Sequence, residues 1–517
     1  MSEATNLLGE SLEAFRVEEN TEATPPKQEA TKRLKPIDRS QCFWGAIDIE
    51  KLIEEDHPAR GIWAMVNQLD LTRLEEKIKA VEGRAGQSRL DPRLLMSLWI
   101  YGYSEGTSSA RELSRMCEYE PGCQWLTGMQ GVNYHTLSDF RVDHKDELDG
   151  IFVQVLGLLS GEALIEMKRI TQDGTKVKAQ AGGNSFRREE RVRQHLQLAR
   201  EQVEAMGSPE SEELSQRVIQ ARKRASREKK QRLEEALKEL EQIQKTRAES
   251  EKAQVRVSET DPEARVMKQP HGGFTPSYNV QISTDAANGI IVGVDVTQAG
   301  NDCDQLVNGI ERVEANTGQT PEQVLVDGGY TMKNSNIEAM AERGIDLNGP
   351  IVENNSEASL KQRGIQPEFY PDKFRYDETT DTFTCPAHKT LRQSRTRPCE
   401  GRIEYTYRAS AADCRACSFQ DRCCPKNSPR MVVRKEDSPA VKAFRAKMET
   451  EPAKQLYRTR AQIAEFPHAW IKEKLGLRRF RLRGRQKVRA EAVWTCLTYN
   501  IQQWLRLVWR RSVQTTA

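Results

Sequence analysis

The sequence predicts a mixed α/β core that follows an all-helical region. From Ile47 to Leu158 apolar residues recur at helical spacing, as in Leu94, Leu95 and Leu98. Three later segments instead alternate apolar and polar residues or carry short β-branched runs: MKRITQDGTKVKAQ, SYNVQISTDAANGIIVGVDVTQ and EQVLVDGGY. Helical patterns in CDQLVNGIERVEANTG and NSNIEAMAERG lie next to the last strand, so a sheet with a parallel component is expected.

The composition indicates a soluble chain with more than one structural unit. It has 517 residues, 30% charged and 37% hydrophobic, with a formal net charge of +3. A chain of this length exceeds what one core usually organises, so about two to four units are expected. No apolar run could span a bilayer, and the start, MSEATNLLGESLEAF, lacks the features of a signal peptide. We therefore expect a cytoplasmic location without membrane contact, and reduced rather than disulfide-bonded cysteines.

The helical region is expected to form a separate domain over residues 41–160, after a disordered polar tail over residues 1–40. Within it, SSARELSRMCEYEPGCQWLTG followed by NYHTLSDFRVDH indicates two helices joined by a turn. This unit could read DNA as a helix-turn-helix, with Tyr134, His135 and Arg141 available, or it could be an ordinary packed hairpin. The sequence favours neither.

The α/β domain is expected over residues 161–517, with Asn288-Gly289 marking a hairpin turn and two inserts interrupting the core. Residues 187–253 are rich in Glu, Lys, Arg, Leu and Ala, with Leu233, Leu237 and Leu240 at i, i+4 and i+7, which predicts a helical hairpin of coiled-coil character. It could bind a second subunit or pack on itself. Residues 353–434 carry most of the cysteines and few periodic apolar positions.

Three acidic residues stand where the pattern would not otherwise place them. Asp173 lies inside a predicted strand, and Asp327 ends an apolar run and precedes two glycines, which let a ligand or backbone approach closely. Glu465 lies on a predicted helix, on one stripe with Arg458 and Lys472 if the helix continues through Pro467. Taken singly, each acid is explained as well by a turn cap or a surface ion pair.

Taken together, the three acids predict a metal site. Two carboxylates about 4 Å apart repel by roughly 4 kcal/mol at an effective dielectric of about 20, so a cluster needs a cation. Mg²⁺ prefers oxygen ligands and joins carboxylates to phosphate oxygens. Two such ions suit the in-line displacement of a phosphodiester, and we expect Mn²⁺ to substitute for them.

The ordered segments TQDGTKVKA, DPEARVMKQPHGGFTPSYNVQISTDAANGIIVGVDV, VLVDGGY, NGPI and YRTRAQIAEFPHAWIKEKLGLRRFRLRG resemble the DDE transposases of bacterial insertion sequences. The closest likeness is to the branch numbered eleven-eighty-two, over nearly the whole chain. The resemblance implies an RNase H-like fold, Mg²⁺ dependence, cleavage of DNA at element ends and transfer of the ends to target DNA. It assigns Asp173, Asp327 and Glu465 as the catalytic acids and metal ligands.

The resemblance also places DNA-gripping residues around Glu465. Lys472 has the expected spacing, whereas Tyr457 and Arg460 lie one residue further upstream than in the usual pattern, and Arg458 could substitute for Arg460. The basic stretch that follows, RRFRLRGRQKVR, has the composition of a nucleic-acid contact, within an expected basic C-terminal helix region over residues 478–511. Its predicted DNA-binding residues are Arg478, Arg479, Arg481, Arg483, Arg485 and Lys487.

The cysteines of the second insert have two interpretations. Cys414, Cys417 and Cys423 form CxxCx₅C, and Cys385 precedes them. Four thiols in a segment that lacks a predicted core could hold a structural Zn²⁺. Because the spacing is not the paired CxxC of a zinc ribbon, reduced and partly buried thiols remain an equal alternative.

DNA is therefore the expected partner, both as element ends and as target, and the protein is expected to act on it as a homo-oligomer, at least a dimer. Two other functions fit the same residues: a metal-dependent nuclease that does not join ends, and a DNA-binding repressor derived from a transposase. The presence of all three acids disfavours the repressor.

Overall fold

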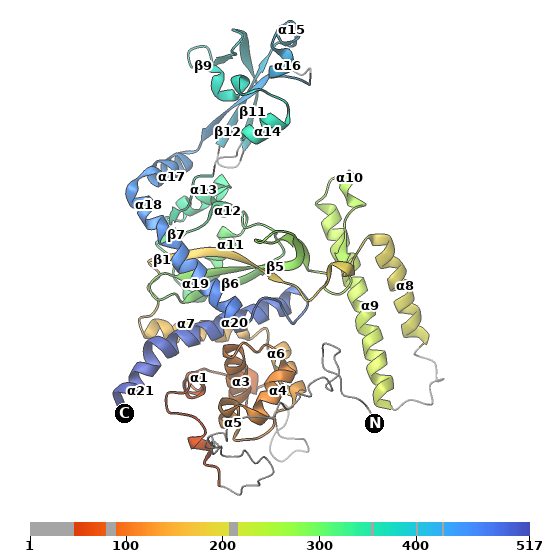
Figure 1. Cartoon of the computed structure of the whole chain (residues 1–517), viewed down its shortest axis with the longest axis vertical. Helices are drawn as coiled ribbons and strands as arrows, with labels where there is room; N and C mark the ends of the chain where they lie inside the picture. Colours follow the sequence, from red (N-terminus) through yellow and green to blue (C-terminus); the bar gives the residue numbers. More distant parts are fainter. Residues whose placement is uncertain are drawn as a thin grey trace, which may run out of the picture. The chain divides into compact units, whose positions relative to one another are not determined.

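The computed structural model describes residues 46–78, 89–205, 216–352, 356–399, 402–426 and 429–516 (Figure 1). The predicted tail over residues 1–40 lies outside these ranges, as do residues 206–215 of the predicted first insert. None of the helices within them is both long enough and apolar enough to cross a bilayer.

Among the described residues, seven α-helices precede the first strand. They are α1 (Pro58–Val66), α2 (Thr72–Glu75), α3 (Pro92–Ser104), α4 (Ala110–Tyr119), α5 (Pro121–Thr127), α6 (Tyr134–Asp143) and α7 (Leu148–Gly161). Helices α1, α3 and α5 each begin with proline, whose fixed φ suits the first helical turn. The side chains of His57, Asp91 and Glu120 cap them by accepting a backbone N–H.

The structure corrects one residue expected at the helix-turn-helix surface. Arg141 on α6 is buried: it lies over the Trp99 ring and donates to Tyr103 Oη at 3.1 Å and to the Ser108 carbonyl at 2.8 Å. Its role is therefore packing within the helical region, because a guanidinium held on three sides by protein cannot reach DNA. Of the other two residues named for this surface, His135 is exposed and Tyr134 is half-buried.

A six-stranded mixed sheet follows. Its strands are β1 (Arg169–Lys178), β4 (Arg265–Lys268), β5 (Phe274–Asp285), β6 (Ile291–Thr297), β7 (Gln323–Leu325) and β8 (Asp346–Asn348). Strand β5 pairs antiparallel with β1, β4 and β6, whereas β7 pairs parallel with both β1 and β8. The predicted turn at Asn288-Gly289 joins β5 to β6, with Gly289 at φ 69°. Helices α11 (Leu306–Thr317), α12 (Gly328–Thr331) and α13 (Asn334–Glu342) fall between β6 and β8.

Helix α20 (Arg485–Trp504) joins the helical region and the sheet into one hydrophobic core. It packs against α3, α7 and β6 (Figure 1). Its side chains from Ala490 to Ile501 are all buried. Asn500 satisfies its amide by exchanging two hydrogen bonds with the Ile291 backbone, at 2.9 and 2.8 Å. The expectation of a basic helix over residues 478–511 is therefore wrong beyond its first turn. The chain continues through a π-helical turn (Leu505–Trp509) into α21 (Arg510–Thr516).

The basic stretch before α20 is held in place by a buried acid. Glu491 accepts hydrogen bonds from the backbone N–H groups of Arg481 and Leu482, at 3.0 to 3.1 Å. Glu491 is fully buried, and Phe480 packs edge-on against Tyr278. Backbone and Phe480 thus point inward, which leaves the neighbouring arginine side chains exposed.

Replacing Glu491 with Ala should lower the free energy of unfolding by about 2 kcal/mol, because it leaves two backbone donors without their acceptor. Glu491→Gln keeps one oxygen acceptor and should lose less. Denaturant unfolding of the two variants beside the wild-type protein measures this difference. Equal stability of all three proteins would show that the loop does not depend on this side chain.

The first insert forms a helical hairpin with a small core of its own. Helices α8 (Glu189–Ala205) and α9 (Gln216–Lys245) pack against each other, and α10 (Glu249–Lys252) follows. The core consists of Val192, Leu196, Ala199, Leu233, Ala236, Leu240 and Val257. Of the predicted leucines, Leu233 and Leu240 are buried and Leu237 is half-buried, so this stripe packs within the chain. The short strands β2 (Phe186–Arg187) and β3 (Val257–Ser258) pair at its base.

The second insert is a five-stranded antiparallel sheet. Its strands are β9 (Arg375–Asp377), β10 (Thr382–Thr384), β11 (Thr390–Cys399), β12 (Arg402–Ala409) and β13 (Met431–Asp437). The short helices α14 (Ser356–Gln362), α15 (Ala411–Arg415) and α16 (Gln420–Cys423) accompany them. Phe374, Phe383, Leu391, Tyr407, Ala409 and Val432 form its core. The expectation that this segment lacks a core is wrong, because a few aromatic residues on one face suffice for a small sheet.

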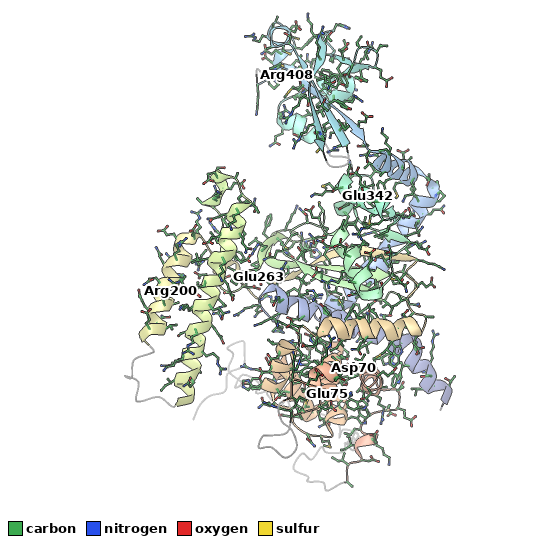
Figure 2. The ribbon with its side chains drawn as sticks, turned by 180° about the vertical axis from the view of Figure 1, so that it is seen from behind. Asp70, Glu75, Arg200, Glu263, Glu342 and Arg408 are labelled. Carbon is green, nitrogen blue, oxygen red and sulfur yellow. The ribbon has the colours of Figure 1, made fainter. Side chains whose placement is uncertain are left out.

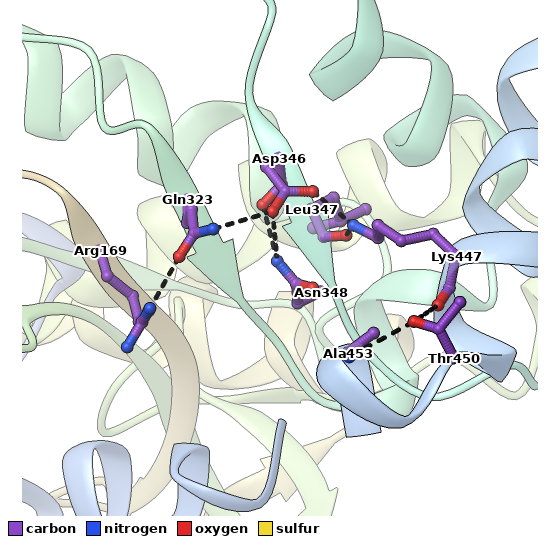
Figure 3. Close-up of polar contacts among 8 residues, drawn as sticks. All are labelled: Arg169, Gln323, Asp346, Leu347, Asn348, Lys447, Thr450 and Ala453. Carbon is purple, nitrogen blue, oxygen red and sulfur yellow. Dashed lines mark hydrogen bonds and ion pairs between the residues drawn. The ribbon is translucent and has the colours of Figure 1, made fainter. Parts of the chain in front are cut away.

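After the second insert the chain returns to the edge of the mixed sheet. Lys447 on α17 (Pro439–Glu449) donates to Asp346 Oδ1 at 2.5 Å and to the Leu347 carbonyl (Figure 3). Asp346 also accepts from Gln323 and Asn348, at 3.1 Å each. Burial opposes ionisation of Asp346, but hydrogen bonds from Lys447 and Asn348 lower its pKa below the usual value. This network fixes the start of α18 (Glu451–Arg458) and α19 (Arg460–Glu473) beside the sheet.

Candidate active site

Asp173 lies within β1 and faces α19. Its Oδ2 is 3.2 Å from Arg460 Nη2 and 3.7 Å from His468 Nε2, and its Oδ1 accepts from the Gly174 N–H at 2.9 Å. The side chain is 18% exposed. Burial raises the pKa of this carboxyl above its usual value, although the Arg460 charge opposes the shift. Asp173 is therefore a partly buried acid whose charge is compensated mainly by one guanidinium.

Asp327 follows β7 and caps α12 by accepting the Gly329 N–H at 2.9 Å. The parallel pairing of β1 with β7 matches Thr171 with Leu325. Because Asp173 and Asp327 each lie two residues beyond that pair, strand register places the two acids level with each other. Burial raises the pKa of Asp327, and the charge of Asp173 raises it further. Each acid thus disfavours ionisation of the other.

Glu465 lies on α19, which continues through Pro467 without interruption. It is exposed and forms no ion pair or hydrogen bond within the described residues. Its charge is nonetheless close enough to raise the pKa of Asp173. Asp173 and Asp327 are therefore adjacent, whereas Glu465 lies near them without direct contact. Across the described ranges, no three His, Cys, Asp or Glu side chains converge tightly enough to hold a metal ion.

A fourth acid, Asp302, lies at the same place and was not predicted from the sequence. It stands in the loop between β6 and α11, where Asn279 Nδ2 and Gln281 Nε2 donate to its Oδ1 at 2.7 and 2.6 Å. Its charge raises the pKa values of Asp173 and Asp327. Its sequence signal is weak, because NDCD supplies two acids in a polar loop and only the fold separates Asp302 from Asp304.

A buried polar network supports these acids from inside the sheet. Gln281 accepts from Gln172 Nε2 at 3.0 Å and from Tyr330 Oη at 2.5 Å, and Ser283 Oγ donates to Gln172. Gln172, Gln281, Ser283 and Tyr330 are all buried. Since Gln281 also donates to Asp302, the network orients that carboxylate rigidly.

Glycine at position 174 leaves room for Asp302. A Cβ atom there would lie 2.1 Å from Asp302 Oδ1 and 2.4 Å from Gln281 Nε2. At Gly329 a Cβ atom would lie 3.0 Å from Asp327 Oδ1. The two glycines beside the acids therefore keep the space around the carboxylates open.

Gly174→Ala should destabilise the protein by about 2 kcal/mol, because the new methyl group overlaps hydrogen-bonded atoms that cannot move freely. Gly182→Ala is the matched control, since a Cβ atom at Gly182 meets nothing within 4 Å. Thermal or denaturant unfolding measures both. In the double variant Gly174→Ala/Asp302→Ala the clash with the carboxylate is absent, so the loss should be smaller than the sum of the single losses. Additive losses would contradict the contact.

The predicted DNA-gripping residues divide into two groups. Arg460, Lys472 and Tyr457 lie beside the acids: Arg460 pairs with Asp173, burial lowers the pKa of Lys472, and burial raises the pKa of Tyr457. Arg458 ends α18 and is exposed, so it does not replace Arg460, and the expected stripe of Arg458, Glu465 and Lys472 is interrupted at Thr459.

His468 is a further residue at the site that sequence reasoning missed. Burial lowers its pKa to about 3, so the ring beside Asp173 is neutral near pH 7. Its Nδ1 atom is buried without a hydrogen-bond partner. The sequence signal was the FPHAW segment, whose histidine follows Glu465 by one helical turn.

The side chains of the predicted basic residues before and at the start of α20 are exposed: Arg478, Arg479, Arg481, Arg483, Arg485 and Lys487. Pairing at the ends of the stretch is greater than expected. Arg478 pairs with Glu473, and Arg489 pairs with Asp149 at 2.9 Å and Asp295 at 3.1 Å. Acids outside the stretch therefore neutralise its two ends, whereas the arginines and the lysine between them have no ion-pair partner in the described part of the chain.

Two family models match the chain. A transposase DDE domain matches residues 384–505, which include Glu465, and a second transposase domain matches residues 47–143, which form most of the helical region. The two matches indicate an insertion-sequence DDE transposase. No curated protein matches it.

The cysteines of the transposase's second insert gather around one small cavity, lined by Cys385, Cys414, Cys417, Cys423 and Cys424. Burial raises the pKa of Cys423 to about 12, so this side chain is a neutral thiol in the structure. The Arg430 and Lys389 N–H groups donate to Cys414 Sγ and Cys385 Sγ at 3.5 and 3.3 Å. The cysteines that are grouped in the sequence thus also lie together in the fold. Their side chains are not close enough to one another to form a metal site.

Zinc binding by the transposase remains a prediction. Metal analysis of protein purified under reducing conditions should find about one zinc per chain, because Cys385, Cys414, Cys417 and Cys423 line the same small cavity. Cys414→Ser/Cys417→Ser should lose that zinc, whereas Cys303→Ser, outside the insert, should keep it. Folded protein without zinc would establish that the cysteines are thiols packed around a cavity.

Proposed function

We propose that this transposase cleaves DNA at the ends of its element and transfers the freed 3′ ends to target DNA, with Asp173, Asp327 and Glu465 as the catalytic acids. One observation carries the proposal: Asp173 and Asp327 are partly buried and each lies two residues beyond the β1–β7 pairing, and the helix that bears Glu465 packs against β1. The catalytic domain is proposed to be RNase H-like. Its support is the strand order β6-β5-β1-β7-β8, with β5 antiparallel and β1, β7 and β8 parallel.

The donor set fits Mg²⁺. The acids offer carboxylate oxygens, burial and mutual repulsion raise the pKa values of two of them, and glycines keep their surroundings open. Asp173, Asp327 and Glu465 would hold two Mg²⁺ ions, and Mn²⁺ could replace them. When bound, they would activate the attacking oxygen and stabilise the leaving oxygen of a phosphodiester.

The chain's own residues have defined tasks in this reaction. Arg460 neutralises Asp173 in the absence of other cations. Once a metal ion shares the charge of Asp173, the Arg460 guanidinium would contact a phosphate group of the DNA. Lys472 and Tyr457 lie at the same place and would orient the DNA end. Neutral His468 adds no positive charge beside the acids. The exposed arginines and Lys487 between Arg478 and Arg489 would hold the flanking duplex through its phosphates. Because two ends must be joined, at least a dimer is expected on DNA.

Asp173→Asn and Asp327→Asn should each reduce cleavage of end-labelled DNA by about a thousandfold or more, because each removes a metal ligand. DNA carrying the sequences that flank the gene, Mg²⁺ and a plasmid target are sufficient for the assay. Binding of the labelled DNA should be nearly unchanged in both variants. Asp304→Asn is the control, since Asp304 lies in the Asp302 loop but pairs with Lys333.

The products separate the alternatives. Joined products identify a transposase, nicks without joining identify a nuclease, and binding without cleavage identifies a repressor. Cleavage that persists in both Asn variants would rule out the assigned acids.

A further inference from the structure

The five-stranded sheet of the second insert has two unlike faces. Side chains directly opposite each other in an antiparallel ladder lie on the same face. The ladder matches Leu391 with Ala409, and Gln393 with Tyr407 and then Val432, which gives the aromatic core face. The alternate positions lie on the opposite face. They are Arg392, Arg408 and Met431; Arg395, Thr406 and Val433; and Arg397, Glu404 and Lys435.

This opposite face, here called the arginine face, carries five exposed cations: Arg392, Arg395, Arg397, Arg408 and Lys435. Figure 2 labels Arg408 on this sheet. Within the described residues none of the five has an ion-pair partner. The next rung of this face holds Arg402 and Asp437, and the two acids of the face pair with cations other than these five: Glu404 lies 3.4 Å from Arg402, and Asp437 lies 3.0 Å from Arg445. The positive charge of the arginine face is therefore not compensated by the chain.

The arrangement is unfavourable for the isolated sheet. Arg392 and Arg408 are direct cross-strand neighbours, and like charges in that position destabilise a ladder. Strand β11, TLRQSRTRPC, contains no acid at all. A polyanion would turn this repulsion into attraction, since guanidinium groups bind phosphate through paired N–H donors.

Apolar side chains on the same face argue against a merely solvated surface. Met431 and Val433 are 47% and 42% exposed, directly beside Arg408 and Thr406. A face that mixes arginines with exposed apolar groups suits a ligand that offers both phosphates and apolar sugar edges. The sheet also lies in the chain between Asp327 and Glu465, two residues proposed to act on DNA.

We infer that the arginine face binds duplex DNA through its phosphate groups, as a contact separate from the active site and from the basic stretch before α20. The inference rests on the proposed function, because it takes DNA as the substrate. It adds a surface on the second insert, a segment otherwise distinguished only by its cysteines.

Two matched variants test the inference. The sheet variant carries Arg392→Gln, Arg395→Gln, Arg397→Gln and Arg408→Gln. The helix variant removes the same charge from exposed positions of α9 and carries Arg222→Gln, Arg224→Gln, Arg227→Gln and Lys229→Gln. All eight positions are exposed, so both variants should fold, and thermal unfolding checks this.

Fluorescence anisotropy with a labelled duplex, measured from low to high salt, gives affinity and salt dependence together. The sheet variant should bind about tenfold more weakly, and the slope of log affinity against log salt should flatten by about 3.6, which is about 0.9 for each of four lost phosphate contacts. The helix variant should keep the wild-type slope and an affinity within about threefold of wild type.

Three results would overturn the inference: wild-type affinity and slope in the sheet variant, an equal loss in the helix variant, or a sheet variant that loses binding only to vesicles of anionic lipid. The outcome is independent of catalysis, because binding is measured without cleavage. A wild-type protein that binds no DNA would refute the proposed function itself. Full binding by a folded sheet variant would refute only the arginine face.

Discussion

The candidate active site is built around two partly buried carboxylates: Asp173 lies within β1, and Asp327 follows β7, the parallel neighbour of β1. Thr171 pairs with Leu325, so Asp173 and Asp327 follow at the same height. Strands lie about 4.8 Å apart, and two charges at that spacing repel by on the order of 3 kcal/mol at an effective dielectric of about 20. The chain does not relieve this by separating the acids. Instead it supplies Arg460 at 3.2 Å and leaves glycines beside the carboxylates.

Asp302 adds a further negative charge beside Asp173 and Asp327. Hydrogen bonds from Asn279 and Gln281 hold it in place, and a buried network behind Gln281 allows that side chain little freedom. A site that concentrates negative charge on a rigid support is costly in isolation and well suited to divalent cations. Glu465 differs from the other acids, because it lies on an exposed part of α19. The position of that helix determines how near Glu465 lies to Asp173 and Asp327.

Packing of α20 explains how the two regions matched by family models, which are distant in sequence, come to share one hydrophobic core. Helix α20 contributes buried side chains to a core that contains the N-terminal helices and the mixed sheet, so residues matched by both family models share it. The inserts, in contrast, each have a small core of their own. Variation within an insert can therefore change a contact surface, such as the arginine face, without disturbing the acids.

The sequence by itself determined the order of helical region, strands and inserts, because hydrophobic periodicity is a local property. It also determined Asp173 and Asp327 as exceptional residues, since an acid in a buried strand pattern stands out without any partner. Tertiary structure alone decided which cations meet those acids. Arg460 rather than Arg458 reaches Asp173 because residues two apart on a helical path lie on opposite sides of it, and Thr459 between them keeps helical dihedrals. It alone decided that Asp302 joins the site while Asp304 pairs with Lys333, that Arg141 is buried, and that the arginines of β11 share a face with Arg408. Each of these depends on which distant side chain lies opposite, and pairing between distant segments leaves no mark in the local pattern.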